Sequence, residues 1–150
     1  MIKENERLFK TNKTEQEISN LTLQINYHYH DCIGLVCRGD RMKTWQGFAN
    51  ELSAVLQFPY YFSNNGNSLS ECICDLDWIC KRKIFVFITN AEQILIEESY
   101  GFLHYFERSV EEVPIDSLKY YNEEKHVYYI FQNIDQDFPL FEDKELSDFI

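Results

Sequence analysis

The sequence predicts an α/β domain in which helices pack against a three-stranded parallel sheet. Three short apolar runs, residues 33–37, 84–88 and 127–131, have the length and composition of strands. The middle run, Ile-Phe-Val-Phe-Ile, is apolar at every position, which is typical of a strand covered on both faces. Stretches of helical periodicity separate the runs, and parallel strands require such crossovers, which are usually right-handed.

The first crossover is predicted to contain two helices. After the turn at Arg38-Gly39-Asp40, Thr44 is a suitable N-cap and Pro59 is expected to stop the helix. Between them, apolar residues recur at helical spacing at Trp45, Phe48, Ala49, Leu52, Val55 and Leu56.

A second, acidic helix is expected from about residue 67 to 77. Its apolar arc is predicted to consist of Leu69, Cys72, Ile73, Leu76, Ile79 and Cys80. Glu71, Asp75 and Trp78 are expected to point the opposite way. Ser68 and Glu71 also match the S-x-x-E capping box, in which Glu71 would bond back to the Ser68 amide.

The second crossover is expected to hold two more helices. Asn90 is a candidate cap for a short helix that runs to Leu95. Residues 100–113 carry a further apolar stripe at helical spacing, which Pro114 would end. A polar connection, residues 115–125, then leads to the last strand.

Segments at both ends extend this core. Residues 1–20 are polar and are expected to form a short helix or a frayed arm. Residues 21–27 alternate strictly between apolar and polar, which predicts an extra N-terminal strand with His28 and His30 on its exposed face. The predicted division is an N-terminal extension at 1–31, an α/β domain at 32–131 and an acidic C-terminal extension at 132–150. The aromatic residues of that extension favour docking on its own domain over contact with a partner.

Composition limits the function classes. The chain has 150 residues, enough for one domain, and no apolar run approaches the ~20 residues that span a bilayer. Its start has no apolar signal region, so the protein is expected to be soluble and cytoplasmic. A formal net charge of −11 disfavours direct nucleic-acid binding, which needs Lys and Arg patches. Such a surface suits either a basic protein partner or mere solubility.

The residues predict neither an enzyme nor a metal site. Five cysteines, an odd number, are expected to be reduced thiols, and Cys72, Cys74 and Cys80 lack the second ligand pair that zinc sites use. Glu71 and Asp75 lie one helical turn apart on a convex face, where they enclose no substrate pocket. No catalytic residue, cofactor or small-molecule substrate is therefore predicted.

The stretch FPYYFSNNGNSLSECICDLDWI, residues 58–79, resembles the barstar family, the intracellular inhibitors of barnase-type ribonucleases. The matching elements are Phe58-Pro59, Tyr61-Phe62, Asn65, Leu69, Glu71-Cys72 and Asp75-Leu76-Asp77-Trp78. The order of elements between residues 33 and 131 also fits the family, which has a three-stranded parallel sheet packed with helices.

The resemblance implies that Glu71 occupies the position of the acid that these inhibitors insert into the phosphate site of the nuclease. It implies an aromatic rim at Tyr61 and Phe62. The remaining candidate contacts are Asn65, Asn67, Ser68, Ser70 and Asp75. Three positions depart from the family pattern, namely Ser63, Gly66 and Asn67, and they point to a cognate toxin other than barnase itself.

The predicted function is therefore that of a bacterial immunity protein, in a toxin–antitoxin setting, that occludes the active site of a basic nuclease toxin. Two alternatives remain open. One is an acidic protein–protein interaction module that inhibits no nuclease, and the other is a small hydrolase that uses surface carboxylates.

Overall fold

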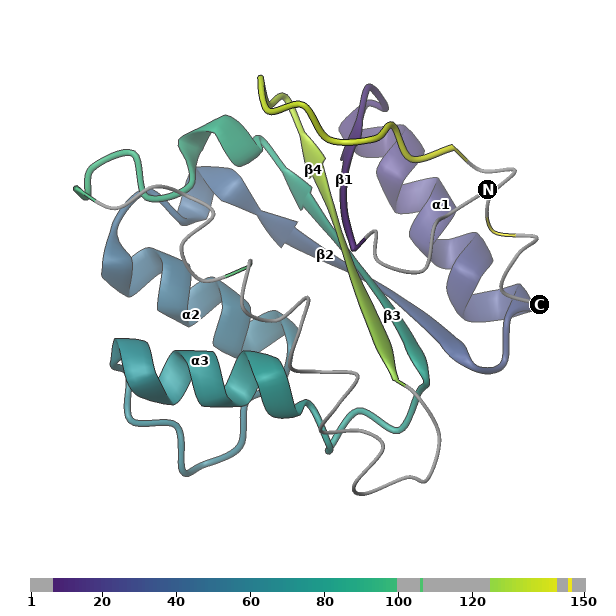
Figure 1. Cartoon of the computed structure of the whole chain (residues 1–150). Helices are drawn as coiled ribbons and strands as arrows, with labels where there is room; N and C mark the ends of the chain where they lie inside the picture. The colour runs from purple at the N-terminus through teal and green to yellow at the C-terminus, as the bar shows by residue number, and fades with distance from the viewer. Residues whose placement is uncertain (1–6, 100–105, 107–124, 143–145, 147–150) are drawn as a thin grey trace.

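The computed structural model describes residues 7–99, 106, 125–142 and 146, except for the side chains of Cys74 and Asp75. They form an α/β structure around one parallel sheet with strand order β1-β4-β3-β2 (Figure 1). The elements in chain order are β1 (Leu8–Thr11), α1 (Glu15–His28), β2 (Cys32–Arg38), the 3-10 helix η1 (Gly39–Arg41), α2 (Trp45–Val55), α3 (Gly66–Asp75), β3 (Lys83–Thr89), the 3-10 helix η2 (Ala91–Gln93) and β4 (His126–Gln132). The predicted class and the three central strands are confirmed, but the sheet has four strands, not three.

The predicted strand at residues 21–27 is wrong, because this segment belongs to helix α1. Its buried residues, Ile18, Leu21, Thr22 and Ile25, follow helical spacing. The other apolar members of the alternating pattern, Leu23 and Tyr27, are 68% and 85% exposed. Thr14 starts the helix with a capping box, in which its hydroxyl accepts from the Glu17 N–H and the Glu17 carboxylate accepts from the Thr14 N–H.

The fourth strand, β1, lies within the stretch for which the sequence predicts a short helix or a frayed arm. It pairs with β4, with Leu8 opposite Tyr129. On its outer edge, the Lys10 N–H donates to the Pro139 carbonyl at 3.0 Å and the Phe141 N–H donates to the Lys10 carbonyl at 2.9 Å. The chain beyond β4 therefore returns alongside β1.

The sheet separates two apolar cores, with α1 on one face and α2 and α3 on the other (Figure 1). On the α1 face, Phe141 is buried against the rings of Phe9, Phe85 and Phe87, at centroid distances of 5.7, 6.0 and 5.8 Å. This part of the C-terminal segment docks on its own domain, as the aromatic residues predicted. The opposite face holds Phe106, whose ring contacts Phe48 of α2. The rest of the predicted helix at 100–113 lies outside the described residues.

The free edge of β2 is also occupied. The Asn26 side chain of α1 donates to the Gly34 carbonyl at 3.1 Å and accepts from the Gly34 N–H at 2.7 Å. A Cβ at Gly34 would lie 3.2 Å from the Thr22 backbone, so glycine permits this close approach of helix and strand. Further along, the Arg38 N–H donates to the buried Glu51 carboxylate at 2.7 Å.

The turn after β3 is shorter than predicted. The helical turn η2 ends at Gln93, not Leu95, and Asn90 precedes it in the left-handed region, at φ 49°, without a side-chain capping bond. The described cysteines, Cys32, Cys37, Cys72 and Cys80, form no disulfide with one another.

Candidate functional site

The candidate site is the exposed side of α3 together with the loop that precedes it. The buried side of α3 consists of Leu69, Cys72 and Ile73, and Leu69 and Ile73 pack in the core shared with α2. On the exposed side lies the Glu71 side chain, with Asn67 exposed and Ser70 half-buried. Asp75 is the last residue of the helix, and its side chain lies outside the description.

The N-terminus of α3 differs from the prediction. The N-cap is Asn65, whose side-chain oxygen accepts from the Ser68 N–H at 2.9 Å. Ser68 is therefore the third helical residue and not the cap, so the predicted Ser68–Glu71 capping box is wrong. The Ser68 hydroxyl instead accepts from the Ser63 N–H at 2.9 Å, which ties the loop to the first turn of the helix. The Glu71 carboxylate is consequently not committed to a capping box.

The predicted C-terminal part of α3 also needs correction. The helix ends at Asp75 because Leu76 turns into the left-handed region at φ 49°. Trp78 and Cys80 then leave the helical pattern. The Trp78 ring is half-buried against Phe58, and its Nε1–H donates to the Leu56 carbonyl at 2.7 Å, while Cys80 is exposed and does not join the apolar side.

The loop before α3 divides its aromatic residues between core and solvent. Phe62 is half-buried and packs edge-to-face on Phe58, at a centroid distance of 5.0 Å. Tyr60 and Tyr61 point outward, with 100% and 49% of their surfaces exposed, and their rings lie edge-to-face at 6.2 Å. Tyr60 is a candidate contact residue that the family pattern did not single out, and its sequence signal is an aromatic residue at a turn after a proline.

A line of amide side chains connects this loop to α2. Asn64 adopts a left-handed conformation at φ 53°, and its side chain donates to the Gln46 side-chain oxygen at 3.0 Å. Gln46 donates in turn to the Asn50 side-chain oxygen at 2.8 Å. These exposed contacts help to set the position of the loop relative to α2.

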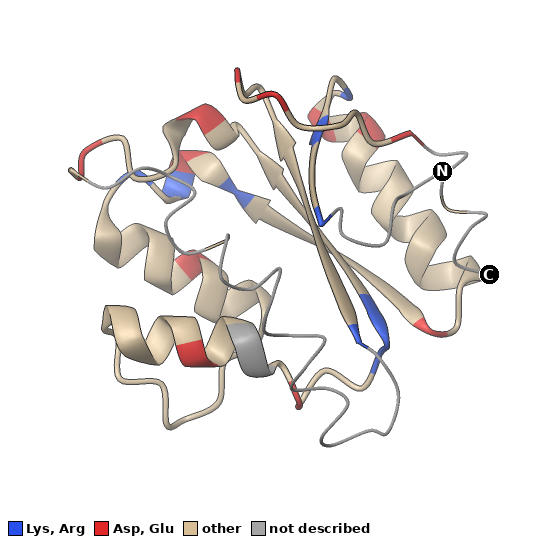
Figure 2. Cartoon of the chain, in the orientation of Figure 1, with Lys and Arg blue, Asp and Glu red and all other residues tan. Residues whose placement is uncertain are grey.

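The charge of this surface has one sign. The sequence contains no lysine or arginine between Lys43 and Lys81, whereas it contains Glu51, Glu71 and two aspartates. Figure 2 shows α2 and α3 without basic residues, whereas basic residues gather where β3 and β4 begin. The negative potential around Glu71 is therefore not cancelled by cations from its own segment.

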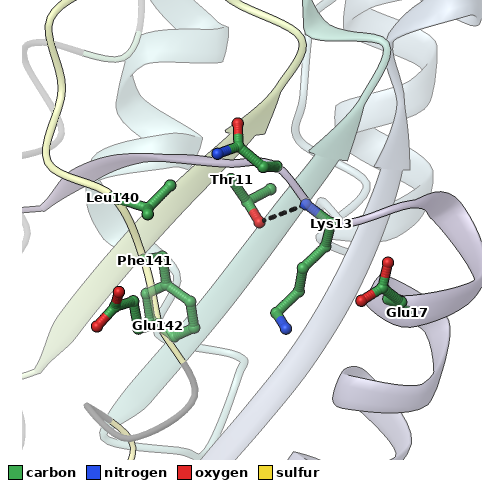
Figure 3. Close-up of a pocket in the computed structure, with 7 residues that line it drawn as sticks. Thr11, Lys13, Glu17, Leu140, Phe141 and Glu142 are labelled. Atoms are coloured by element: carbon green, nitrogen blue, oxygen red, sulfur yellow. Dashed lines mark hydrogen bonds between the residues drawn. The ribbon is translucent and has the colours of Figure 1, made fainter.

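A pocket of about 450 Å³ lies elsewhere, where β1 ends and α1 begins (Figure 3). Its lining residues are Thr11, Asn12, Lys13, Glu17, Leu140, Phe141 and Glu142. Hydrogen bonds from the Thr14 backbone and side chain hold the pKa of Glu17 below its usual value, so this carboxylate is committed to the cap of α1. The pocket contains none of the predicted contact residues, and Figure 3 shows Lys13 reaching between Glu17 and Phe141.

Within the described residues, no three His, Cys, Asp or Glu side chains are placed to hold a metal ion. The same part of the chain contains no helix that is long and apolar enough to cross a membrane. The site presents an exposed carboxylate, exposed tyrosine rings and exposed amide groups on α3 and the loop before it. Such a surface can bind a complementary protein.

Comparison with known proteins identifies the family of this chain. The model of the family Barstar (barnase inhibitor) matches residues 34–131, well over half of the chain. The match runs from β2 to β4 and so includes α3 and the loop before it. A search of curated proteins finds no match.

Proposed function

The chain belongs to the barstar family of barnase inhibitors, and on this premise we propose that it is an immunity protein that occludes the active site of a basic ribonuclease toxin. The observation that carries the proposal is the exposed Glu71 carboxylate, presented by a capped helix within residues 44–80, a stretch that contains no lysine or arginine. In this role the carboxylate takes the place of an RNA phosphate among the cations of the nuclease.

The charge pattern supports this partner. A ribonuclease that binds polyanionic RNA carries Lys, Arg and His in its cleft, and a surface of opposite sign speeds encounter with such a cleft. The proposed contact is protein to protein. It involves no cofactor and no direct binding of nucleic acid.

The predicted contact residues divide into three groups by their positions. Tyr61, Asn67 and Glu71 are exposed and are proposed to contact the nuclease directly, together with Tyr60. Phe62, Asn65 and Ser68 fix the loop and the start of α3 through packing and hydrogen bonds. Ser70 directly precedes Glu71 and Asp75 follows it by about one helical turn, and both are proposed to lie at the margin of the interface.

The cognate toxin is proposed to differ from barnase in the shape of its active site. Asn67 stands on the exposed side of α3 where the family commonly has an acidic residue, so one possible ion pair is absent. Ser63 and Gly66 alter the turn that leads into the helix. Because specificity is a difference between affinities, these changes favour a partner with a reshaped contact surface.

The test is inhibition of RNA cleavage by a barnase-type ribonuclease titrated with the protein. We expect cleavage to cease near one-to-one stoichiometry and Glu71→Ala to weaken binding by about thirtyfold or more, the effect of losing a hot spot worth ~2 kcal/mol. The value of ~2 kcal/mol is the one typical of interface hot spots, and a barstar residue is among the known examples of such hot spots.

Two matched controls separate contact from general charge or aromatic content. Glu92→Ala removes an exposed carboxylate from η2, and Tyr27→Ala removes an exposed tyrosine from α1, on the opposite face of the sheet from α3. Both should leave inhibition unchanged, whereas Tyr60→Ala should weaken it. Equal inhibition by the folded Glu71→Ala variant would place the contact surface elsewhere.

A further inference from the structure

We propose that Lys125 is a positioning residue for α3: its buried ammonium group binds the turn that ends the helix and so fixes the direction in which Glu71 is presented. This inference rests on the proposed function in so far as Glu71 contacts the nuclease. The link between Lys125 and α3 is itself a property of the free protein and can be tested without a partner.

Lys125 directly precedes β4 and is only 2% exposed. Its Nζ donates to the Leu76 carbonyl at 2.5 Å and to the Ile79 carbonyl at 2.6 Å. Lysine is almost never this buried unless its ammonium group is paired. The start of β4 is thereby joined to the end of α3, which lies 49 residues earlier in the chain.

The turn that Lys125 binds has a backbone that needs support. Leu76 is a buried, non-glycine residue with φ 49° and ψ 26°, and its N–H donates to the Cys72 carbonyl at 3.2 Å. Carbonyl oxygens at a helix C-terminus carry the negative end of the helix dipole, which a cation stabilises. Helix α3 has no basic residue in its own last turn, so this cation comes from another part of the fold.

A second contact also holds this turn. The Trp78 Nε1–H donates to the Leu56 carbonyl, which belongs to the C-cap of α2. The turn at residues 76–79 is therefore attached to α2 through Trp78 and to β4 through Lys125. Glu71 lies five residues before Leu76, which is about 7 Å along the helix axis.

This geometry converts a small rotation of α3 into a displacement of the carboxylate. A tilt of about 10° about the turn would move Glu71 by roughly 1 Å, which exceeds the ~0.5 Å tolerance of a well-formed binding constellation. Lys125→Met preserves the length of the side chain but removes the ammonium donor from the Leu76 and Ile79 carbonyl oxygens, which keep only their backbone donors, the Ile79 N–H and the Lys81 N–H. The expected consequence is a loosened α3 within a folded protein.

The first experiment is amide hydrogen exchange on the free protein. Lys125→Met should speed exchange of the amides in residues 70–76 by about tenfold or more relative to those of residues 18–25 in α1. Lys83→Met, which removes a half-buried lysine at the start of β3, serves as the matched control and should not change this ratio. Lys125→Gln retains an N–H donor, should have an intermediate effect, and takes the place of Lys125→Met if that variant does not fold.

Equal acceleration of α1 and α3, or unchanged exchange in α3, would overturn the proposal, since either result means that Lys125 acts on global stability or not at all. The second experiment measures binding to the barnase-type ribonuclease of the inhibition assay in a double-mutant cycle with Glu71→Ala. Lys125→Met should weaken binding about tenfold when Glu71 is present and less than about threefold when it is absent, because the two residues act through one contact. Equal factors in both backgrounds would refute positioning of Glu71.

The two experiments separate the two proposals. If α3 loosens in Lys125→Met but the unaltered protein binds no barnase-type ribonuclease, the positioning role stands and the proposed function fails. If the protein inhibits such a ribonuclease but α3 exchange is unaffected, the proposed function stands and the role of Lys125 fails.

Discussion

Replacement of Asn65 by alanine tests whether this residue caps the N-terminus of α3, the helix that carries the candidate site. The Asn65 side chain accepts the Ser68 N–H at 2.9 Å, and α3 has no acidic residue in its first turn that could replace this contact. Loss of such an N-cap costs about 1 kcal/mol, within a range of about 0.5–2. For a chain of this size the corresponding fall in Tm is about 2–4 °C.

The assay is urea unfolding followed by circular dichroism, with amide exchange of α3 as a local measure. Asn65→Asp should lie within a few tenths of a kcal/mol of the unaltered protein, because aspartate is an equally good N-cap. Asn67→Ala, which alters an exposed asparagine two residues further along, is the matched control and should have little effect.

The same variants separate the cap from the interface. Asn65→Asp preserves the cap, so any change that it makes in nuclease binding reports on contact with the partner. A stability loss for Ser68→Ala accompanied by none for Asn65→Ala would restore Ser68 as the cap and refute the assignment of the helix start. A similar loss for Asn65→Ala and Asn67→Ala would show that capping is not the cause.

Two further predictions concern the rest of the fold. Phe141→Ala should lower the free energy of unfolding by about 3–5 kcal/mol, because it leaves a cavity among three rings. Leu140→Ala, at a partly exposed position, should lower it far less. If urea denaturation shows similar small losses for both variants, the segment does not dock on the sheet. Burial raises the pKa of the Cys37 thiol, so at pH 8 iodoacetamide should modify the exposed Cys80 and leave Cys37 intact, as read by peptide mass spectrometry. The unfolded chain loses the Cys37 thiol proton near the ordinary thiol pKa of ~8.5, whereas the folded chain retains it, so the Cys37 contribution to stability should decrease as pH rises above that value. If a Cys37→Ala variant loses as much stability as the unaltered protein over this pH range, Cys37 is not the cause.

The central strands can be predicted from sequence because their environment leaves a direct pattern. The apolar run at 84–88 lies within β3, where strands pair on both edges and helices or aromatic residues cover both faces. The start of α2 is equally readable, since Thr44 accepts from the Gly47 N–H as an N-cap should. In both cases the deciding interactions are close in sequence or depend only on burial.

The N-terminal helix resembles a strand in sequence for a physical reason. From Leu21 onward the apolar residues alternate, and helical spacing becomes visible only when Ile18, which precedes that window, is taken together with Leu21 and Ile25. The Thr14–Glu17 capping box carries the missing signal. Strand β1 offers only four residues, too few for any period, and its existence depends on pairing with β4, more than a hundred residues away.

The candidate site shows a similar division. Exposure of Glu71 follows from helical spacing, and its partner-binding role remains a prediction. The sequence alone cannot decide whether Asn65 or Ser68 is the N-cap, because both residue types favour that position and the loop geometry decides between them. Lys125 cannot be found from sequence at all, since its partners are carbonyl oxygens distant in sequence.

The occupied borders of the sheet limit how another protein can approach. Asn26 satisfies the backbone of Gly34 in the outermost strand on one side, and residues 139–141 run along β1 on the other. A guest chain that attempted to join as an additional strand would have to displace these groups first. Association through shared backbone ladders, including fibril growth, is thereby discouraged. Recognition is left to side chains on helices and loops, where substitutions can change the choice of partner without disturbing the sheet.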